Sequence, residues 1–292
     1  MWVKIPFIVA GMALALCGGA RAEACGPQKL GVSRTVLVGA PVHVGLKTYP
    51  RTLDLKDHEI VLTFDDGPAP ATNRVLAALE AQCARATFFL IGRNAAAMPA
   101  LVRREIADGD TVGSHSYNHP ILPSLPLARA VANIEAGAAA VDKASGGKAS
   151  RFFRFPGFAD SPALLAALDN TNRPVFGADL WASDWNVMTP REELDLLMGR
   201  LRRAGGGIVL LHDSKRETAD MLPDFLAALK AEGFHIVALA PGDVPPALRK
   251  APSGWKSETE ETLRKMGIGG GKGAAPKIDV PLQEQKDPAN RM

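Results

Sequence analysis

Short apolar runs alternate with longer stretches of helical periodicity between residues 59 and 241. The short runs span about four to six residues, which is typical of strands buried on both faces. They predict strands at 60–64, 86–91, 111–114, 152–155, 175–178, 208–211 and 235–238. The longer stretches predict helices at 73–81, 99–108, 127–144, 161–169, 190–203 and 218–232. This alternation indicates an α/β fold with a parallel sheet built from right-handed β-α-β units.

Strands in this number fit two arrangements. One is a distorted (β/α) barrel of about seven parallel strands, and the other is an open, doubly wound sheet. The periodicity alone does not distinguish them. In both arrangements, polar residues that follow the carboxyl ends of the strands are the first candidates for a functional site.

The first 22 residues have the features of a signal peptide. Lys4 precedes the apolar run at 5–16, and Ala20-Arg21-Ala22 resembles a cleavage site. A membrane anchor is the alternative, but the run is shorter than the ~20 residues that a span needs. A lipid attached at Cys17 is a weaker alternative, because the preceding residue is leucine. The pattern predicts a secreted protein, periplasmic or extracellular, with no stable membrane insertion after signal removal.

Three further segments follow the predicted signal peptide. Residues 23–58 are expected to form an N-terminal extension with short strands near 35–38 and 42–45. Residues 59–242 carry the alternating pattern and are expected to form the catalytic domain. Residues 243–292 are expected to be a mostly disordered tail, apart from a short helix at 258–266 that a capping box at Ser257 and Glu260 predicts.

Charge and cysteine content narrow the class of protein. The net charge of +3 falls to about +1 when Lys4 and Arg21 leave with the signal peptide, so nothing indicates a nucleic-acid partner. No obligate protein partner is inferred either. Cys25 and Cys83 remain in the mature chain, and in an oxidising compartment they are expected to form a disulfide, with two separate thiols as the alternative.

Two polar motifs follow predicted strands and together predict a metal site. Asp65 and Asp66 lie in the segment TFDDGP, where two neighbouring carboxylates call for a cation, although Asp-Gly-Pro is also turn chemistry. His115 and His119 lie in HSYNH, a spacing that lets two imidazoles reach one ion. Each motif alone is ambiguous. Together, two histidines and an aspartate make a three-ligand set with open positions, as in catalytic zinc sites.

Three other segments follow predicted strands. They contain Arg154 before Phe155-Pro156-Gly157-Phe158, Asp184 beside Trp185, and His212 after Leu210 and Leu211. Each alone is equally well explained as a packed or surface residue. Hydrolysis of an amide or ester explains why all would converge. The metal polarises the carbonyl and activates water, a carboxylate takes the proton, a histidine protonates the leaving group, and an aromatic side chain holds a sugar face.

In this order, the motifs resemble those of the polysaccharide deacetylase family, also called the NodB-homology domain or carbohydrate esterase family four. The resemblance covers about residues 59–240 and implies a distorted barrel with one divalent metal, usually zinc and sometimes cobalt. It implies these roles: Asp65 as general base, oriented by Arg154; Asp66, His115 and His119 as metal ligands; His212 as general acid, partnered by Asp184; Leu210 and Trp185 as walls of the acetyl pocket.

One position departs from the family pattern. The family has an aromatic residue three positions after the arginine, whose backbone N–H serves the oxyanion, whereas this chain has Gly157 there and Phe158 next. The change affects the expected groove wall more than the chemistry. The segment VFGADLWASDW at 175–185 also resembles exported bacterial members of the family.

The sequence therefore predicts a metal-dependent hydrolase of linear amides. Metal-activated water would remove N-acetyl groups from a polysaccharide of the chitin, peptidoglycan or exopolysaccharide type. Two alternatives stay open: an O-acetyl esterase or small-amide hydrolase of the same fold, and a glycan-binding protein without activity. The esterase or small-amide hydrolase would use the same metal chemistry as the N-deacetylase, so the motifs do not distinguish these two.

Overall fold

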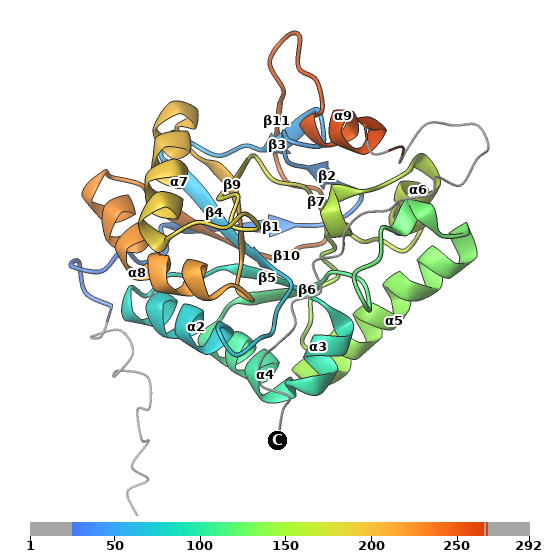
Figure 1. Cartoon of the computed structure of the whole chain (residues 1–292), viewed down its shortest axis with the longest axis horizontal. Helices are drawn as coiled ribbons and strands as arrows, with labels where there is room; N and C mark the ends of the chain where they lie inside the picture. Colours follow the sequence, from blue (N-terminus) through green and yellow to red (C-terminus); the bar gives the residue numbers. More distant parts are fainter. Residues whose placement is uncertain (1–24, 266, 268–292) are drawn as a thin grey trace, which may run out of the picture.

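The structure, a computed structural model, describes residues 25–265 and 267 (Figure 1). Its central sheet is parallel throughout, and helices cover the outside. The strands are β1 Arg34–Val38, β2 His43–Val44, β3 Arg51–Leu53, β4 Glu59–Asp65, β5 Thr87–Leu90, β6 Thr111–Ser114, β7 Val175–Phe176, β8 Leu180–Trp181, β9 Gly207–His212, β10 His235–Pro241 and β11 Leu248–Lys250. The helices are α2 Thr72–Ala81, α3 Gly92–Ala97, α4 Pro99–Asp108, α5 Leu127–Ser145, α6 Pro162–Asn170, α7 Pro190–Ala204, α8 Arg216–Ala231 and α9 Glu258–Lys265. The expected α/β class is confirmed.

The sheet curves toward a barrel. Strand β4 lies at its centre, and β8, β9, β4, β5 and β6 follow one another in register. Isolated parallel bridges then lead from Ser114 through Phe153 to Val175, and β7 pairs with β2. Among the described residues, no ladder joins β2 back to β8, so strand pairing leaves the ring open there.

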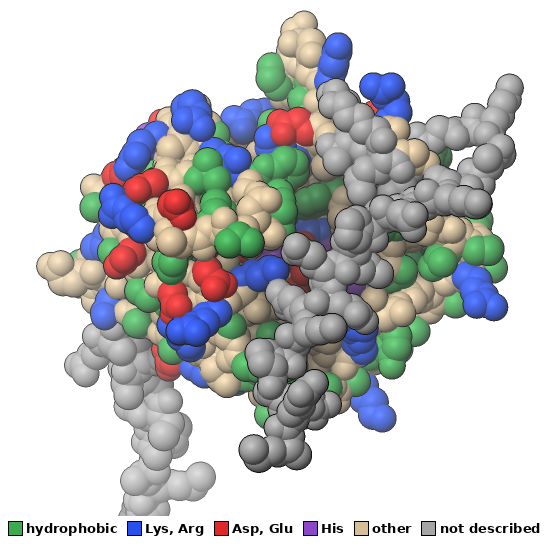
Figure 2. Space-filling view, in the orientation of Figure 1, with side chains coloured by type: hydrophobic (Ala, Val, Ile, Leu, Met, Phe, Trp, Pro, Cys, Tyr) green, Lys and Arg blue, Asp and Glu red, His purple; other side chains and the backbone are tan. Residues whose placement is uncertain are grey.

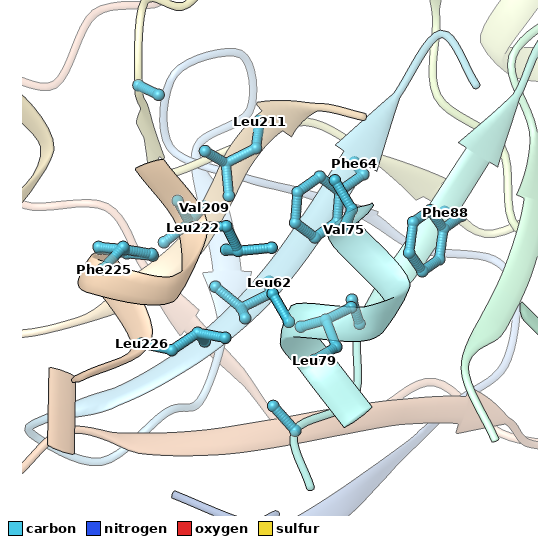
Figure 3. Packing of buried hydrophobic residues seen from close by; sticks show 14 of the residues in the cluster. Leu62, Phe64, Val75, Leu79, Phe88, Val209, Leu211, Leu222, Phe225 and Leu226 are labelled. Atoms are coloured by element: carbon cyan, nitrogen blue, oxygen red, sulfur yellow. The ribbon is translucent and has the colours of Figure 1, made fainter. Parts of the chain in front are cut away.

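Alternating side chains of β4 face two different cores. Ile60, Leu62 and Phe64 pack outward against α2 and α8. Figure 3 shows this packing for Leu62 and Phe64. Val61 packs in the other direction, with Phe89 and Phe176 of the neighbouring strands. Because strand side chains alternate, Thr63 and Asp65 share the inward face with Val61. The fold therefore directs the first motif carboxylate into the sheet's concave side.

Helices pack around the outside in a continuous series. Contacts run from α7 to α8, α2, α4, α5 and α6, and α3 packs on α5. The sequence did not predict the short helix α3 or the two- and three-residue strands β3, β8 and β11. The predicted strand at 152–155 is reduced to a single bridge at Phe153. Strand segments this short lack the run length on which periodicity depends.

The N-terminal segment is part of the sheet rather than an extension beside it. Strands β1 and β2 lie close to the expected positions 35–38 and 42–45, but β1 pairs with β10 along its whole length. The polar–apolar alternation of β1 gives no sign of this long-range partner. Residue 58 is therefore not a structural boundary. The expected signal peptide at 1–22 lies outside the described residues.

The expected boundary at residue 242 also differs from the structure. Strand β11 pairs antiparallel with β3, and the Trp255 indole donates a 2.6 Å hydrogen bond to the Leu46 carbonyl. Residues 243–257 were expected to belong to a mostly disordered tail, but β11 and Trp255 attach this segment to the fold. Their apolar residues are too few and too scattered to form a periodic pattern. Helix α9 agrees with the expected helix at 258–266, and the tail at 268–292 lies outside the described residues.

Cys25 and Cys83 are joined by a disulfide that closes a loop of sequence separation 58. A loop of this length constrains the unfolded chain, which corresponds to about 4 kcal/mol in the chain-entropy treatment. The bond ties the segment before β1 to the end of α2.

Replacing both cysteines with serine is expected to lower the free energy of unfolding by about 2–4 kcal/mol. Urea unfolding of the double variant beside the wild type, each with and without reductant, measures this. Reductant should destabilise only the wild type. A wild type that contains two titratable thiols would contradict the pairing.

No helix among the described residues has both the length and the apolar character needed to cross a bilayer.

Candidate active site

The strand register brings the motifs together. Asp65, the last residue of β4, lies opposite His212, the last residue of β9. Ser114, just before His115, ends β6, and its bridge to Phe153 places Arg154 alongside. All of these positions lie at carboxyl ends of parallel strands, where α/β folds build their sites. His side chains are visible near the middle of the face in Figure 2.

Asp66, His115 and His119 form a cluster that could hold a metal ion. One ligand atom from each lies within 4.8 Å of the others. The Asp66 Oδ1 atom is 3.4 Å from Nε2 of His119 and 3.7 Å from Nε2 of His115. Ligands about 2.1 Å from a tetrahedral ion are separated by about 3.4 Å. The two Asp66–histidine distances are close to this value, as a zinc-sized cation requires.

Two further observations support a cation at this cluster. Asp66 Oδ1 is buried and has no hydrogen-bond partner among the described residues, which is costly unless an ion binds it. The His115 Nδ1 atom lies 2.8 Å from the Arg154 carbonyl, so Nδ1 carries the proton and Nε2 faces the cluster unprotonated. Burial lowers the pKa of His115 to about 3, which keeps the ring in the neutral, metal-binding form.

The loops that carry the ligands have unusual backbone conformations. Asp66 and His119 adopt φ values of 73° and 61°, in the left-handed region that costs side-chain-bearing residues about 1–3 kcal/mol. The Asn94 side chain holds Asp66 in place by donating to its carbonyl at 2.9 Å. Gly67 is required next to it, because a Cβ there would lie 2.1 Å from a carboxylate oxygen of the buried Asp213.

Asp65 is held beside the cluster by a buried arginine. Arg154 is fully buried, and its Nη1 donates to Asp65 Oδ1 at 2.7 Å and to Thr63 Oγ1 at 2.8 Å. The guanidinium also donates to the carbonyls of Phe176 and Gly177, which fixes its plane. Burial raises the pKa of Asp65, and the charge of Arg154 counteracts part of that effect. This carboxylate is fixed in orientation, and Arg154 occupies one of its two oxygens.

His212 forms a second acid–base pair with Asp184. Its Nδ1 lies 2.8 Å from Asp184 Oδ1, and its backbone N–H donates to Oδ2 at 2.7 Å. Burial opposes protonation of His212, but the Asp184 carboxylate outweighs it and raises the pKa of the ring to about 9. The ring is then charged at neutral pH. Its Nε2 lies 3.9 Å from Asp66 Oδ2, facing the cluster.

Behind Asp184 lies a hydroxyl relay that no sequence motif indicated. Thr218 Oγ1 is 3.0 Å from Asp184 and 3.0 Å from the buried Glu193. A hydroxyl has one proton and can donate to only one carboxylate. Burial, reinforced by the charge of Asp184, raises the pKa of Glu193 to about 7. Protonated Glu193 can donate to Thr218, and Thr218 can then donate to Asp184.

Aromatic rings continue from His212 along the rim. Trp185 is 47% exposed and meets the His212 ring edge-on at 6.1 Å. The ring centroids of Trp181 and Trp185 are 5.6 Å apart, and those of Phe158 and Trp181 are 6.1 Å apart. Trp181 was not among the predicted site residues. The row supplies apolar surface for a ligand beside the acid–base pair.

The remaining predicted residues lie near Trp181 and at the Phe158 end of the row. Leu210 is buried in β9 and pairs in register with Trp181 and Thr63. Gly157 adopts a φ of 59°, while Phe158 turns toward the Arg154 guanidinium at 5.8 Å. The Phe158 N–H already donates to the Phe155 carbonyl, so of these two N–H groups only that of Gly157 remains for a ligand.

Comparisons with known proteins identify similar sequences and folds. A family model described as polysaccharide deacetylase matches residues 52–174. The chain is 31% identical over 193 residues to a peptidoglycan-N-acetylmuramic acid deacetylase of Bacillus subtilis, covering 65% of this chain and 39% of the relative. It is 34% identical over 164 residues to chitin deacetylase 1 of Saccharomyces cerevisiae, covering 54% and 53%. The chain thus spans about two fifths to about half the length of these curated relatives.

Two solved structures share the fold. A Bdellovibrio bacteriovorus peptidoglycan deacetylase matches with a TM-score of 0.62 and 30% identity, covering 72% of this chain and 61% of that one. A family 4 carbohydrate esterase from Streptomyces lividans, in complex with acetate, matches with a TM-score of 0.54 and 30% identity, covering 65% and 98%.

Proposed function

This chain belongs to the polysaccharide deacetylase family, carbohydrate esterase family four, and from that membership we propose that it hydrolyses N-acetyl groups of an N-acetylated polysaccharide. The observation that carries the proposal is that a three-residue cluster suited to a cation has a separate carboxylate, suited to act as a base, beside it. Asp66, His115 and His119 converge on one point, while Asp65 is kept beside them by Arg154.

The ligand set supports a divalent cation, with zinc as the first choice and cobalt as the second. Bound there, it would polarise the acetamido carbonyl and lower the pKa of water in the site. Asp65 takes the proton from the attacking water, because its free oxygen faces the cluster, 3.8 Å from His115 Nε2. Arg154 holds the carboxylate in that orientation.

His212 supplies the proton that the leaving amine needs. The ring is charged at neutral pH, and Asp184 keeps its Nδ1–H engaged so that the Nε2–H faces the reacting group. The Gly157 N–H is the proposed donor to the developing oxyanion. Trp185 and Leu210 form the walls against which the acetyl group and its sugar lie.

The same evidence supports a place of action outside the cytoplasm. The disulfide between Cys25 and Cys83 requires an oxidising compartment, and residues 1–22 have signal-peptide features. We place the protein in the periplasm or the extracellular space.

The proposed catalytic unit includes the strands β1–β3 and the segment 248–260 as well as residues 59–242.

The decisive experiment combines metal analysis with acetate release from chitin oligomers, peptidoglycan and acetylxylan. The proposal expects about one zinc per chain and acetate from at least one N-acetylated glycan. Release from acetylxylan alone would replace the amide with an ester as the substrate bond. Glycan binding without any release would favour the glycan-binding alternative.

Asp184→Asn is expected to lower turnover by roughly 10²- to 10⁴-fold, because it removes the charge that keeps His212 protonated. The alkaline limb of the pH–rate profile should move to lower pH, since the ring loses the carboxylate that raises its pKa. Thr218→Val removes one hydrogen bond to the same carboxylate and should cost only about 3- to 10-fold. Equal losses in both variants would contradict this ordering.

A further inference from the structure

A charged side chain beside the aromatic row has no part in the proposed chemistry. The Lys47 ammonium lies 4.8 Å from the ring centroid of Trp181, which is separated from His212 by Trp185. Lys47 also forms an ion pair with Glu258 of α9. From His212, the contacts pass through Trp185 and Trp181 to Lys47 and Glu258.

Lys47 is held in position from both sides of the fold. Its carbonyl accepts the backbone N–H groups of Glu258 and Thr259 at the start of α9, and its own N–H donates to the Ala178 carbonyl. The neighbouring Leu46 N–H donates to Asp179, and the Leu46 carbonyl accepts from the Trp255 indole. In Figure 1, α9 lies next to β3 and β11.

The opposite partner, Trp181, is equally fixed. It ends β8, and its carbonyl accepts a 2.6 Å hydrogen bond from Arg200 of α7. Strand β8 is parallel to β9, so Trp181 lies at the same rim as His212. The ammonium and the ring therefore form a preorganised surface element, built from segments distant in sequence.

Resting on the proposed function, we propose that Lys47, Glu258 and Trp181 form a distal saccharide subsite that selects uncharged N-acetylhexosamine units. Trp185 separates the subsite from His212 in the series of ring contacts, so the proposal places a sugar other than the reacting one there. An ammonium has three donors, of which Glu258 takes one, and a carboxylate accepts several hydrogen bonds. Donor and acceptor side by side match sugar hydroxyls, which both donate and accept.

The ion pair between Lys47 and Glu258 is the basis of the proposed selectivity for uncharged sugars. A lone lysine would attract a carboxylate, such as that of a muramic or uronic acid unit. Glu258 cancels that attraction and adds a like charge at close range, which costs binding energy when partly shielded from water. The subsite therefore favours chitin-like chains over acidic glycans.

Lys47→Met tests the subsite through a ratio. The ratio of kcat/KM for a chitin hexasaccharide to that for the disaccharide is expected to fall about 3- to 10-fold, since only the longer chain reaches Lys47. Glu258→Gln is expected to raise kcat/KM on glycan strands that contain muramic acid relative to the chitin hexasaccharide, also several-fold. Lys148→Met and Glu80→Gln, at exposed positions, serve as matched controls.

A binding measurement separates this proposal from the proposed function. Titration of the hexasaccharide into Asp65→Asn, with and without Lys47→Met, reports the subsite without turnover. Weaker binding in the double variant supports the subsite even if the wild type releases no acetate. Equal affinity, an unchanged length ratio or an unchanged glycan preference in Glu258→Gln would overturn it.

Discussion

Asp65→Asn is expected to reduce acetate release by roughly 10²- to 10⁴-fold while the protein keeps its metal. The amide has nearly the shape of the carboxylate but does not take a proton from water. Because Asp66, His115 and His119 are unchanged, the ligand cluster survives. Turnover and metal content should therefore separate in this variant.

The substitution also affects a buried charge. Arg154 is fully buried and loses its carboxylate partner, although the carbonyls of Phe176 and Gly177 and the Thr63 hydroxyl still accept its hydrogen bonds. Breaking such a pair costs about 3–5 kcal/mol of stability. Urea unfolding must therefore accompany the kinetics, which are compared at a temperature where the variant is folded.

Asp224→Asn on the exposed side of α8 is the matched control and should retain both activity and stability. Two outcomes would contradict the assignment of Asp65. Wild-type turnover in Asp65→Asn would remove it from the role of base. Loss of the metal would make it a ligand instead.

The residues that could be predicted from sequence are those whose neighbours carry a local pattern. Asp65 and His212 each end an apolar strand, and parallel register then places them side by side. The strand ends fixed the position of Arg154 in the same way, although its strand shortens to one bridge at Phe153. For these residues, local periodicity and the rules of parallel sheets are sufficient.

Other residues act through long-range contacts that leave no local signal. Thr218 and Glu193 lie on separate helices and meet only where α7 and α8 pack together behind Asp184. Lys47 comes from the segment expected to be an extension, and Glu258 from the segment expected to be a tail. Their positions depend on tertiary packing, which the spacing of residues in the chain does not encode.

The second large effect concerns the ligands themselves. Asp66→Ala, His115→Ala and His119→Ala are each expected to weaken zinc binding by at least about 100-fold, because even outer partners of a metal site contribute 10- to 100-fold. Turnover should fall with metal occupancy. The buried, unpartnered Oδ1 of Asp66 predicts the largest loss for that residue.

Thermal unfolding with and without zinc gives a readout that does not depend on substrate. A cation that binds only the folded protein stabilises it by about 2.7 kcal/mol at a concentration of 100 times Kd. The melting temperature of the wild type should therefore rise when zinc is added, whereas that of the three ligand variants should rise little.

His212→Ala is the informative control, because it removes a nearby imidazole that is hydrogen-bonded to Asp184. It is expected to keep the zinc-dependent gain and lose turnover. A wild type that neither contains zinc nor gains stability from it would refute the metal site. The convergence of one carboxylate and two imidazoles would then need an explanation other than metal binding.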